Sequence, residues 1–190
     1  IFAIHPIHTE VVANVKSRDE IMSFLFIVLT LQSVFEYYDT KKTRHIISGM
    51  FWYFLALLSK EWGITLVALI PISIYVFRKD GAWKSVFAAL PYALIAAVYV
   101  GIRYTISGKG RTEEITEVLN NPYLYANGEE KIATKIFVLI KYLRLMIFPH
   151  PLSADYSYNT IPYRKFFDAG VLFSLAAHVF LIGYGFIMVI

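Results

Sequence analysis

The chain has 190 residues, of which 57% are hydrophobic and only 17% charged, and its mean hydropathy is +0.55. Soluble domains usually carry about 25% charged residues, because a water-facing surface needs charge and a lipid-facing one is penalised for it. The composition therefore excludes an ordinary soluble domain, the absence of cysteine excludes disulfides and thiolate sites, and a net charge of +4 is too small to indicate nucleic-acid binding.

The chain begins at Ile1 inside what reads as a loop motif and ends inside an apolar run at Ile190, so we expect an internal fragment of a larger protein. A membrane span needs about 20 mostly apolar residues, and fewer where the flanking side chains snorkel. Roughly six segments meet this description, at residues 21–38, 46–58, 62–77, 86–104, 135–148 and from 167 to the end. The sequence therefore predicts an all-α polytopic transmembrane helical bundle.

The fifth of these segments is the weakest prediction. Lys141 and Arg144 interrupt it at helical spacing. It could cross the membrane with these cations facing the bundle, or lie in the interface as an amphipathic helix.

Short basic loops predict the orientation of the bundle. The loops at residues 41–44 and 78–84 are basic, and two predicted spans separate them. They therefore lie on the same side, which the positive-inside rule makes cytoplasmic. We expect residues 1–20, the turn at residues 59–61 and the loop at about residues 105–134 on the extracytoplasmic side.

The first candidate site lies before the first span. His5, His8 and Glu10 carry groups that suit a divalent metal, although a helical zinc site places its histidines at i and i+4. The alternative is a structural or substrate-contacting role, in which Thr9 or Ser17 caps a helix and Glu20 occupies the third position after Ser17. The same stretch continues with further charged residues, namely Lys16, Arg18 and Asp19.

The second candidate site is the turn Ser59-Lys60-Glu61-Trp62. A lysine beside a glutamate between two spans is costly unless the pair is solvated or used. The simplest interpretation is a polar turn that reaches water. The functional interpretation is an anion site at the outer membrane surface, where Lys60 meets a lipid phosphate or pyrophosphate and Glu61 orients Lys60 or takes a substrate hydroxyl.

Two further features could contribute to a site. Arg103 lies with Tyr104 at the outer end of the fourth span, where arginines commonly snorkel, but it could share a phosphate with Lys60 across a cleft. In the motif from Asp155 to Tyr158, which includes Tyr156, the Asp155 carboxylate could cap a helix, accept a hydrogen bond from Tyr158 or recognise a substrate. No phosphate-cradling glycine loop, GxSxG elbow or HExxH motif is present, so ATP-driven transport gains no support.

Three motifs, HPIHTEVVANVKSRDE, LLSKEWGIT and LRLMIFPHPLSADYSYNTIP, resemble in the same order the transmembrane and tetratricopeptide-repeat-containing proteins and their bacterial relatives. These are similar to the protein O-mannosyltransferases within the GT-C group of membrane glycosyltransferases. The resemblance covers nearly the whole chain and implies that residues 1–190 are part of a single GT-C-like transmembrane domain. It further implies transfer of a sugar, typically mannose, from a polyprenyl-phosphate carrier to an acceptor protein or glycan on the extracytoplasmic face, usually with inversion.

The resemblance also implies site residues. In such enzymes a carboxylate in the first outer loop acts as base or positions the acceptor, and cationic residues hold the carrier phosphate. That loop would lie upstream of Ile1, and any repeats would lie downstream, so we expect the fragment alone to be inactive. Within the chain the catalytic candidates are Glu61 and Glu10, and the substrate-binding candidates are Lys60, Arg103, His5, His8, Arg18, Asp19, Asp155 and Tyr156. We expect no cofactor, with a divalent metal as the less favoured alternative.

Two other classes of protein stay open at this point. A transporter or flippase of a lipid-linked substrate would place ionisable residues near the membrane midplane, whereas here charges gather at span ends except for Lys141 and Arg144. A non-catalytic membrane scaffold would lack an acidic pair in the upstream loop. The expected partners are the polyprenyl-phosphate donor, the acceptor and membrane lipids, and the expected location is a bacterial inner membrane, with the endoplasmic reticulum as the alternative.

Overall fold

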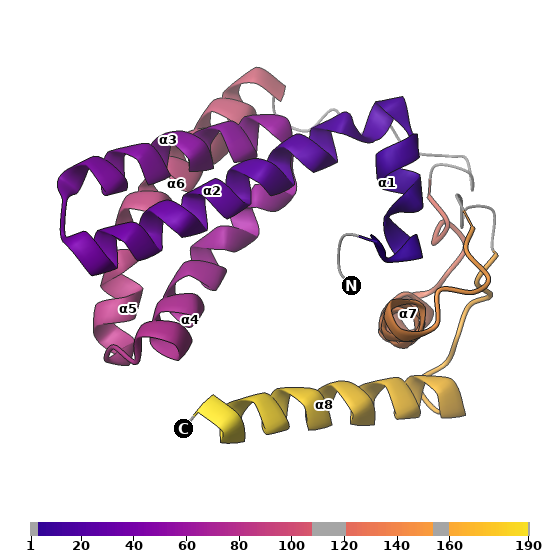
Figure 1. Cartoon of the computed structure of the whole chain (residues 1–190). Helices are drawn as coiled ribbons and strands as arrows, with labels where there is room; N and C mark the ends of the chain where they lie inside the picture. Colours follow the sequence, from indigo (N-terminus) through magenta and orange to yellow (C-terminus); the bar gives the residue numbers. More distant parts are fainter. Residues whose placement is uncertain (1–3, 108–120, 154–159, 190) are drawn as a thin grey trace. The chain divides into compact units, whose positions relative to one another are not determined.

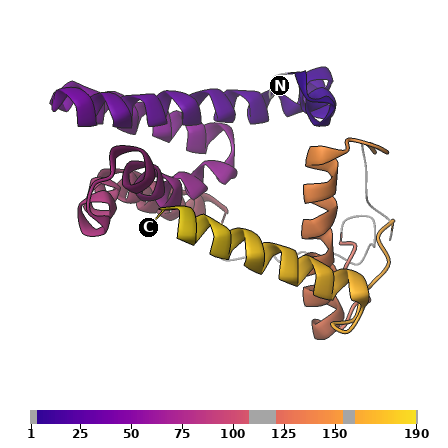
Figure 2. The same ribbon diagram turned by 60° about the horizontal axis from the view of Figure 1, so that its bottom comes forward.

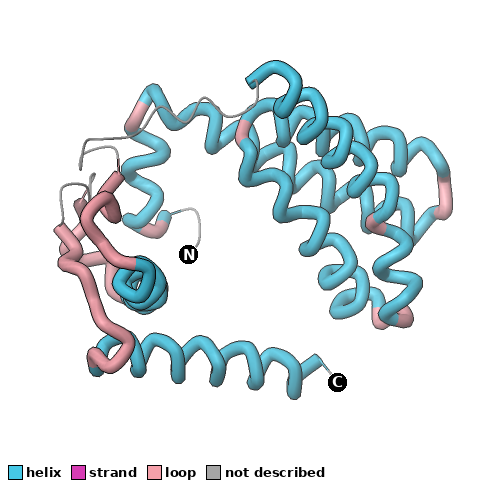
Figure 3. Tube along the Cα trace, turned by 180° about the vertical axis from the view of Figure 1, so that it is seen from behind, coloured by secondary structure: helices cyan, strands magenta, loops and turns pink. Residues whose placement is uncertain are grey.

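The computed structural model describes residues 4–107, 121–153 and 160–189. These residues form helices joined by loops, and no strand occurs among them (Figure 3). The chain divides into two compact units, one made of Ile1–Thr9 with Thr112–Ile190 and the other of Glu10–Arg111. The all-α prediction is confirmed, and each unit is described in turn below.

Short helical turns precede the first long helix. They are η2 (Pro6–His8), α1 (Thr9–Ala13) and η3 (Val15–Ser17). Proline begins η2, where its missing amide costs least, and the side chain of Asn14 accepts the Lys16 amide at 3.0 Å to start η3. These local bonds lead the chain into the long helix that follows.

The unit Glu10–Arg111 is built around a helical hairpin of α2 (Arg18–Thr40) and α3 (Thr43–Ser59), which run side by side in Figure 1. The turn between them is tight because Lys41 adopts a left-handed backbone conformation with φ 55° and its amide donates to the Tyr37 carbonyl at 2.8 Å. The chain continues through η4 (Glu61–Thr65), α4 (Leu66–Arg78), α5 (Ala82–Ala88) and α6 (Leu90–Ser107). Helix α6 packs against α3.

The core of this unit is apolar and closely packed. Tyr53 on α3 and Ile70 on α4 are fully buried, and the Tyr53 ring contacts the Tyr92 ring of α6 with centroids 5.9 Å apart. Gly49 permits this packing, since a Cβ atom there would lie 2.6 Å from the Tyr92 hydroxyl. Many large apolar side chains remain exposed on the outside of the helices, among them Phe24, Leu25, Val28, Ile47, Phe51, Leu69, Ile72, Leu94 and Val98. Such a surface suits lipid rather than water.

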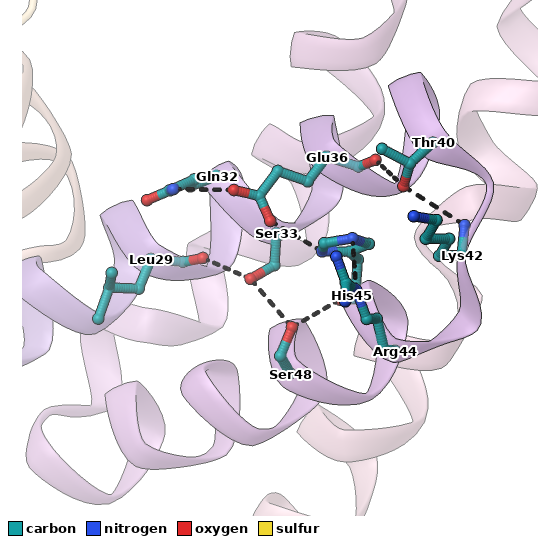
Figure 4. A network of polar contacts seen from close by, with 9 residues as sticks. All are labelled: Leu29, Gln32, Ser33, Glu36, Thr40, Lys42, Arg44, His45 and Ser48. Carbon is teal, nitrogen blue, oxygen red and sulfur yellow. Dashed lines mark hydrogen bonds and ion pairs between the residues drawn. The ribbon is translucent and has the colours of Figure 1, made fainter.

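A polar network joins α2 and α3 near the Lys41 turn (Figure 4). His45, which is 8% exposed, directs its Nδ1 at the Glu36 carboxylate at 2.8 Å, and Glu36 also accepts from the Gln32 amide at 2.9 Å. The Arg44 Nε–H donates to His45 Nε2 at 3.2 Å, so that nitrogen is an acceptor and the ring proton lies on Nδ1. Both ring nitrogens are therefore occupied, and the network closes this end of the hairpin.

The two basic loops lie at the same end of this unit, as the sequence predicts. Arg78, which ends α4, bonds the Asp39 carboxylate at 2.8 Å near the end of α2, and its guanidinium lies 5.0 Å from the Phe35 ring centroid. The turn at residues 59–61 lies at the other end of the hairpin, because α2 and α3 run antiparallel.

The other unit contains α7 (Gly128–Ile147) and α8 (Ala169–Val189), which cross in Figure 2. Asn127 and Glu130 form a capping box that begins α7, each side chain accepting the other's backbone amide. Ser174 of α8 donates to the Ile136 carbonyl at 2.5 Å, and Gly170 allows the Phe137 ring to approach the α8 backbone.

Each of the predicted spans is helical, but the predicted number of spans is too high. Within the described residues, Val15–Thr40, Glu61–Arg78 and Ala169–Met188 are long and apolar enough to cross a membrane. Helices α5 and α6 add a fourth if the pair, bent by 43°, counts as one span. Helix α3, with 17 residues, lies at the short end of the lengths that cross a membrane, and it runs back from the basic-loop end of α2 to the start of η4. Helix α7 carries four cations and two glutamates, which leaves the amphipathic alternative for α7. The protein is an all-α membrane protein with fewer spans than the sequence indicated.

Candidate functional site

The candidate site lies at the end of the hairpin opposite the basic loops, within the unit Glu10–Arg111. Helix α3 ends at Ser59 because Lys60 turns to extended backbone at φ −154° and ψ 138°. Gly63 is buried against α3, where a Cβ atom would lie 3.3 Å from the Ala56 carbonyl carbon. This close approach holds the η4 turn on α3 and orients Lys60 and Glu61 beside the start of α2.

Lys60 is held by two carboxylates from the first turn of α2. Its Nζ lies 2.8 Å from Asp19 Oδ2 and 3.0 Å from Glu20 Oε1. The other Asp19 oxygen accepts the Glu20 amide at 2.9 Å, which fixes the carboxylate relative to the helix. Hydrogen bonds from Lys60 to Asp19 and then Glu20 raise the pKa of Lys60 above its ordinary value, so its side chain is a cation at neutral pH.

Glu61 forms an ion pair with Arg103 near the end of α6. Arg103 Nη1 also donates to the Tyr99 hydroxyl at 3.2 Å, one helical turn earlier on the same face. The Arg103 and Glu61 side chains are 52% and 54% exposed, whereas that of Lys60 is 29% exposed. An ion pair this open contributes little to stability because water screens it, so an incoming anion can replace the carboxylate at Arg103.

We call Asp19, Glu20, Lys60, Glu61 and Arg103 the ionic cluster. Three segments that are distant in the sequence supply it, namely the start of α2, the turn at Lys60 and Glu61, and the end of α6. The peptide bond between Lys60 and Glu61 joins its two halves. Cations of this kind bind phosphate, and carboxylates accept a proton from a hydroxyl. Both functions are therefore available at one end of a membrane bundle.

Sequence reasoning assigned some of these contacts wrongly. Of the two roles considered for Glu61, orienting Lys60 does not match the contacts, because Glu61 pairs with Arg103 while Asp19 and Glu20 hold Lys60. Its other role, taking a substrate hydroxyl, stays a prediction. Ser17 makes no capping bond, so the capping box proposed with Glu20 does not form. Sequence reasoning could have identified Glu20 because it follows Asp19 immediately before an apolar run. Two adjacent carboxylates at the end of a span repel each other and are stabilised by a cation.

The other candidates before α2 make local contacts. His5 Nδ1 accepts the Ile7 amide at 3.3 Å, and the His5 and His8 rings lie edge to face with centroids 6.3 Å apart. Glu10 accepts from the Asn14 side chain at 3.1 Å, and Arg18 donates to the Val15 carbonyl at 3.1 Å.

The alternative of a metal site gains no support from these contacts. In the part of the chain that the structure describes, no group of at least three histidine, aspartate or glutamate side chains could hold a metal ion. Asp155 and Tyr156 lie outside the described residues.

The chain is similar to proteins named protein O-mannosyl-transferases. It is 25% identical to tmtc2 of Xenopus laevis over 182 residues, which are 87% of this chain and 22% of that protein. It is 27% identical to a Caenorhabditis elegans protein O-mannosyl-transferase over 163 residues, 85% of this chain and 22% of that protein. A shorter match, 34% identical over 76 residues, covers 36% of the chain and 10% of human TMTC4.

These similarities confirm the resemblance to the transmembrane and tetratricopeptide-repeat-containing proteins. The chain spans about a fifth of the length of the first two relatives, as the 22% coverage shows. No protein-family model matches the chain, and no solved structure matches it.

Proposed function

We propose that the protein is a membrane glycosyltransferase that moves a sugar, mannose by preference, from a polyprenyl-phosphate carrier to an acceptor protein on the extracytoplasmic face. The observation that carries the proposal is the ionic cluster, which gathers Lys60 and Arg103 with three carboxylates at the end opposite the basic loops. Its relatives are named as transferases of mannose to protein, which supports a sugar donor and a protein acceptor.

The first step is binding of the carrier phosphate at the cations. The phosphate of a lipid-linked donor stays at the membrane surface, and we expect the end of the hairpin that carries Lys60 and Arg103 to lie at the same level. A phosphate oxygen replaces the Glu61 carboxylate at Arg103, because the pair is half-exposed and weak. Lys60 is more enclosed and supplies a second positive charge that its carboxylate partners hold in place.

The second step is transfer of the sugar. The acceptor hydroxyl oxygen attacks the anomeric carbon while the bond from that carbon to the phosphate oxygen breaks. The electron pair of the broken bond passes to the phosphate, whose developing charge is stabilised by the two cations. Glu61, released from Arg103, is a carboxylate placed to accept the proton of the acceptor hydroxyl.

Donor binding would thus release the base that the reaction needs. The arrangement uses Arg103 twice, first as the partner that keeps Glu61 in place and then as a phosphate ligand. The extracytoplasmic face is periplasmic if the protein resides in a bacterial inner membrane and luminal if it resides in the endoplasmic reticulum.

The test is sugar transfer by the full-length protein in membranes with a labelled polyprenyl-phosphate mannose donor. Lys60→Ala should lower turnover by about 100-fold, the effect of removing one group that stabilises a developing oxyanion. Glu61→Gln should lower turnover with little change in donor affinity, because it removes the base and leaves the cations.

Lys84→Ala is the matched control, since it removes an exposed lysine, 78% accessible, from the opposite end of the same unit. Turnover of this variant should equal that of the unaltered protein. If Lys60→Ala at matched expression transferred mannose at the normal rate, the ionic cluster would not be the donor site. No transfer from any lipid-linked sugar by the folded protein would instead favour a transporter or a scaffold.

A further inference from the structure

The unit containing α7 and α8 has a cavity of its own. Its volume is about 330 Å³, and it lies between α7 and the loops that precede and follow that helix. Thr134, Val138, Lys141 and Leu145 line one side at spacings of four, three and four residues, which places them on one face of α7. Tyr163 covers the other side.

Hydrogen bonds hold this cavity in shape. The Tyr163 hydroxyl donates to the Pro122 carbonyl at 2.8 Å and ties the loop after α7 to the loop before it. The Arg164 amide donates to the Thr134 hydroxyl at 2.9 Å, and Thr134 is 1% exposed. The walls are therefore fixed by side chain to backbone bonds across the unit.

The charged groups among the described lining residues are basic. Lys141, Arg144 and His150 are the ionisable nitrogen groups among them, and no described aspartate or glutamate lines the cavity. Within the described residues, none of the ion pairs involves these side chains. Lys141 lies 5.5 Å from the Phe137 ring centroid, a contact that leaves its charge uncompensated.

The rest of the lining is apolar or aromatic. It consists of Pro122, Val138, Leu145, Pro151 and Ile161 together with the rings of Tyr123, Tyr142 and Tyr163. Burial raises the pKa of Tyr123, with Tyr142 adding to the effect, so the Tyr123 hydroxyl keeps its proton and can donate to an anion. The volume is at the low end of the roughly 300–1,000 Å³ of small-molecule sites, enough for a headgroup and the first part of a chain.

Helix α7 itself suits a membrane surface. It has apolar residues and four cations along its length, and it is not among the helices apolar enough to cross a membrane in the described part of the chain. Such a helix lies in the interface, where phosphate headgroups are concentrated.

We propose that this cavity binds the phosphate headgroup of an anionic lipid, with Lys141, Arg144 and His150 around the phosphate and the first part of the lipid chain along Val138 and Leu145. A soluble phosphate ester carries the same phosphate group and could bind the same cations, but the apolar wall of the cavity and the interfacial position of α7 favour a lipid. This site lies on residues that the transfer mechanism does not use, so it does not depend on the proposed function.

The experiment measures lipid binding to the full-length protein in a non-ionic detergent. A fluorescent phosphatidic acid is titrated and then displaced by phosphatidic acid, phosphatidylcholine, polyprenyl phosphate or inorganic phosphate. Lys141→Gln with Arg144→Gln should weaken binding by about tenfold or more, since hydrogen bonds to charged groups are lost. Val138→Phe should also weaken binding, because it narrows the cavity with every charge kept.

The matched control is Lys131→Gln with Lys165→Gln, the same change of charge on residues of this unit that do not line the cavity. Its affinity should stay within about twofold of that of the unaltered protein, because a charge that does not contact the ligand contributes little. Thermal melts of all variants check that each is folded.

Several results would overturn the proposal. Unchanged affinity in the Lys141 and Arg144 variant, or an equal loss in the control, would mean that the cavity is not the site. Equal displacement by phosphatidylcholine would exclude recognition of net negative charge, and equal displacement by inorganic phosphate would exclude a lipid. Mannose transfer does not enter this readout, so a loss of lipid binding and a failure of the proposed function can be told apart.

Discussion

The two ends of the α2–α3 hairpin use the same kinds of residues in opposite ways. At the end near the Lys41 turn, His45 is buried and bonded through both ring nitrogens to Glu36 and Arg44 (Figure 4). At the other end, the side chains of the ionic cluster are between 29% and 54% exposed. The first end is centred on a buried histidine, whereas no side chain of the ionic cluster is buried and the second end is open to a ligand.

The difference shows why charge alone does not identify a site. A buried polar group that loses its partner keeps the full penalty of desolvation, so the partners of His45 are structural. An exposed cation that loses its carboxylate is solvated by water or taken by another anion at little cost. The two ends contain similar residue types, so solvent exposure is what distinguishes a structural role at one end from a ligand-binding role at the other.

The largest expected effect is on transfer at the open end. Arg103→Ala should lower mannose transfer by about 100-fold, because it removes a phosphate ligand and leaves Glu61 without its partner. Arg103→Lys keeps the charge without the guanidinium fork and should lie between Arg103→Ala and the unaltered protein. The measurement is kcat and KM for the labelled donor in membranes, and equal activity of all three proteins would contradict the open-end assignment.

His45→Ala at the closed end should act on stability instead. Removing a buried ring leaves a cavity between α2 and α3 and breaks the bonds at both of its nitrogens, and we expect a loss of about 2 kcal/mol in the free energy of unfolding. Thermal unfolding of the purified protein in detergent measures it. A His45→Ala variant that melts normally but no longer transfers sugar would mean that this end acts in transfer and not in stability, which contradicts the comparison between the two ends.

Gly63→Ala should have a smaller effect that reaches the open end through packing. A Cβ atom would lie 3.3 Å from a backbone carbon of Ala56, which cannot rotate away, so the η4 turn must shift. We expect a loss of about 1 kcal/mol and a lowered transfer rate, since Lys60 and Glu61 move with the turn. Gly81→Ala, where a Cβ atom meets nothing within 4 Å, is the control and should leave transfer unchanged.

The smallest effect is expected for Arg78→Ala beside the basic loops. Its ion pair with Asp39 is partly exposed, so its loss should change the free energy of unfolding by only about 0–1 kcal/mol. Thermal melts at low and high salt would test this, because salt screens exposed pairs. A much larger loss of stability would contradict this prediction and would mean that the Arg78–Asp39 ion pair is important for the stability of the unit.

Much of the helical fold follows from the sequence, because long apolar runs bounded by charge can satisfy their backbone groups in a membrane only as helices. That argument predicted the helices on both sides of residues 59–61 and the long C-terminal helix. The number of spans did not follow from it. The cations of α7 distinguish that helix from a span, and the 17 residues of α3 are at the short limit for one. A search for apolar runs does not weigh these features.

The sequence by itself determined that Lys60 and Glu61 occupy a turn between two apolar helices, since their charges exclude them from the helix interiors. Only the tertiary structure decided that Asp19 and Glu20 hold Lys60 while Arg103 holds Glu61. Lys60 and Asp19 are 41 residues apart, so no local pattern relates them. Which charges meet depends on how the helices pack, and in this unit small residues such as Gly49 and Gly63 set that packing by allowing close approach.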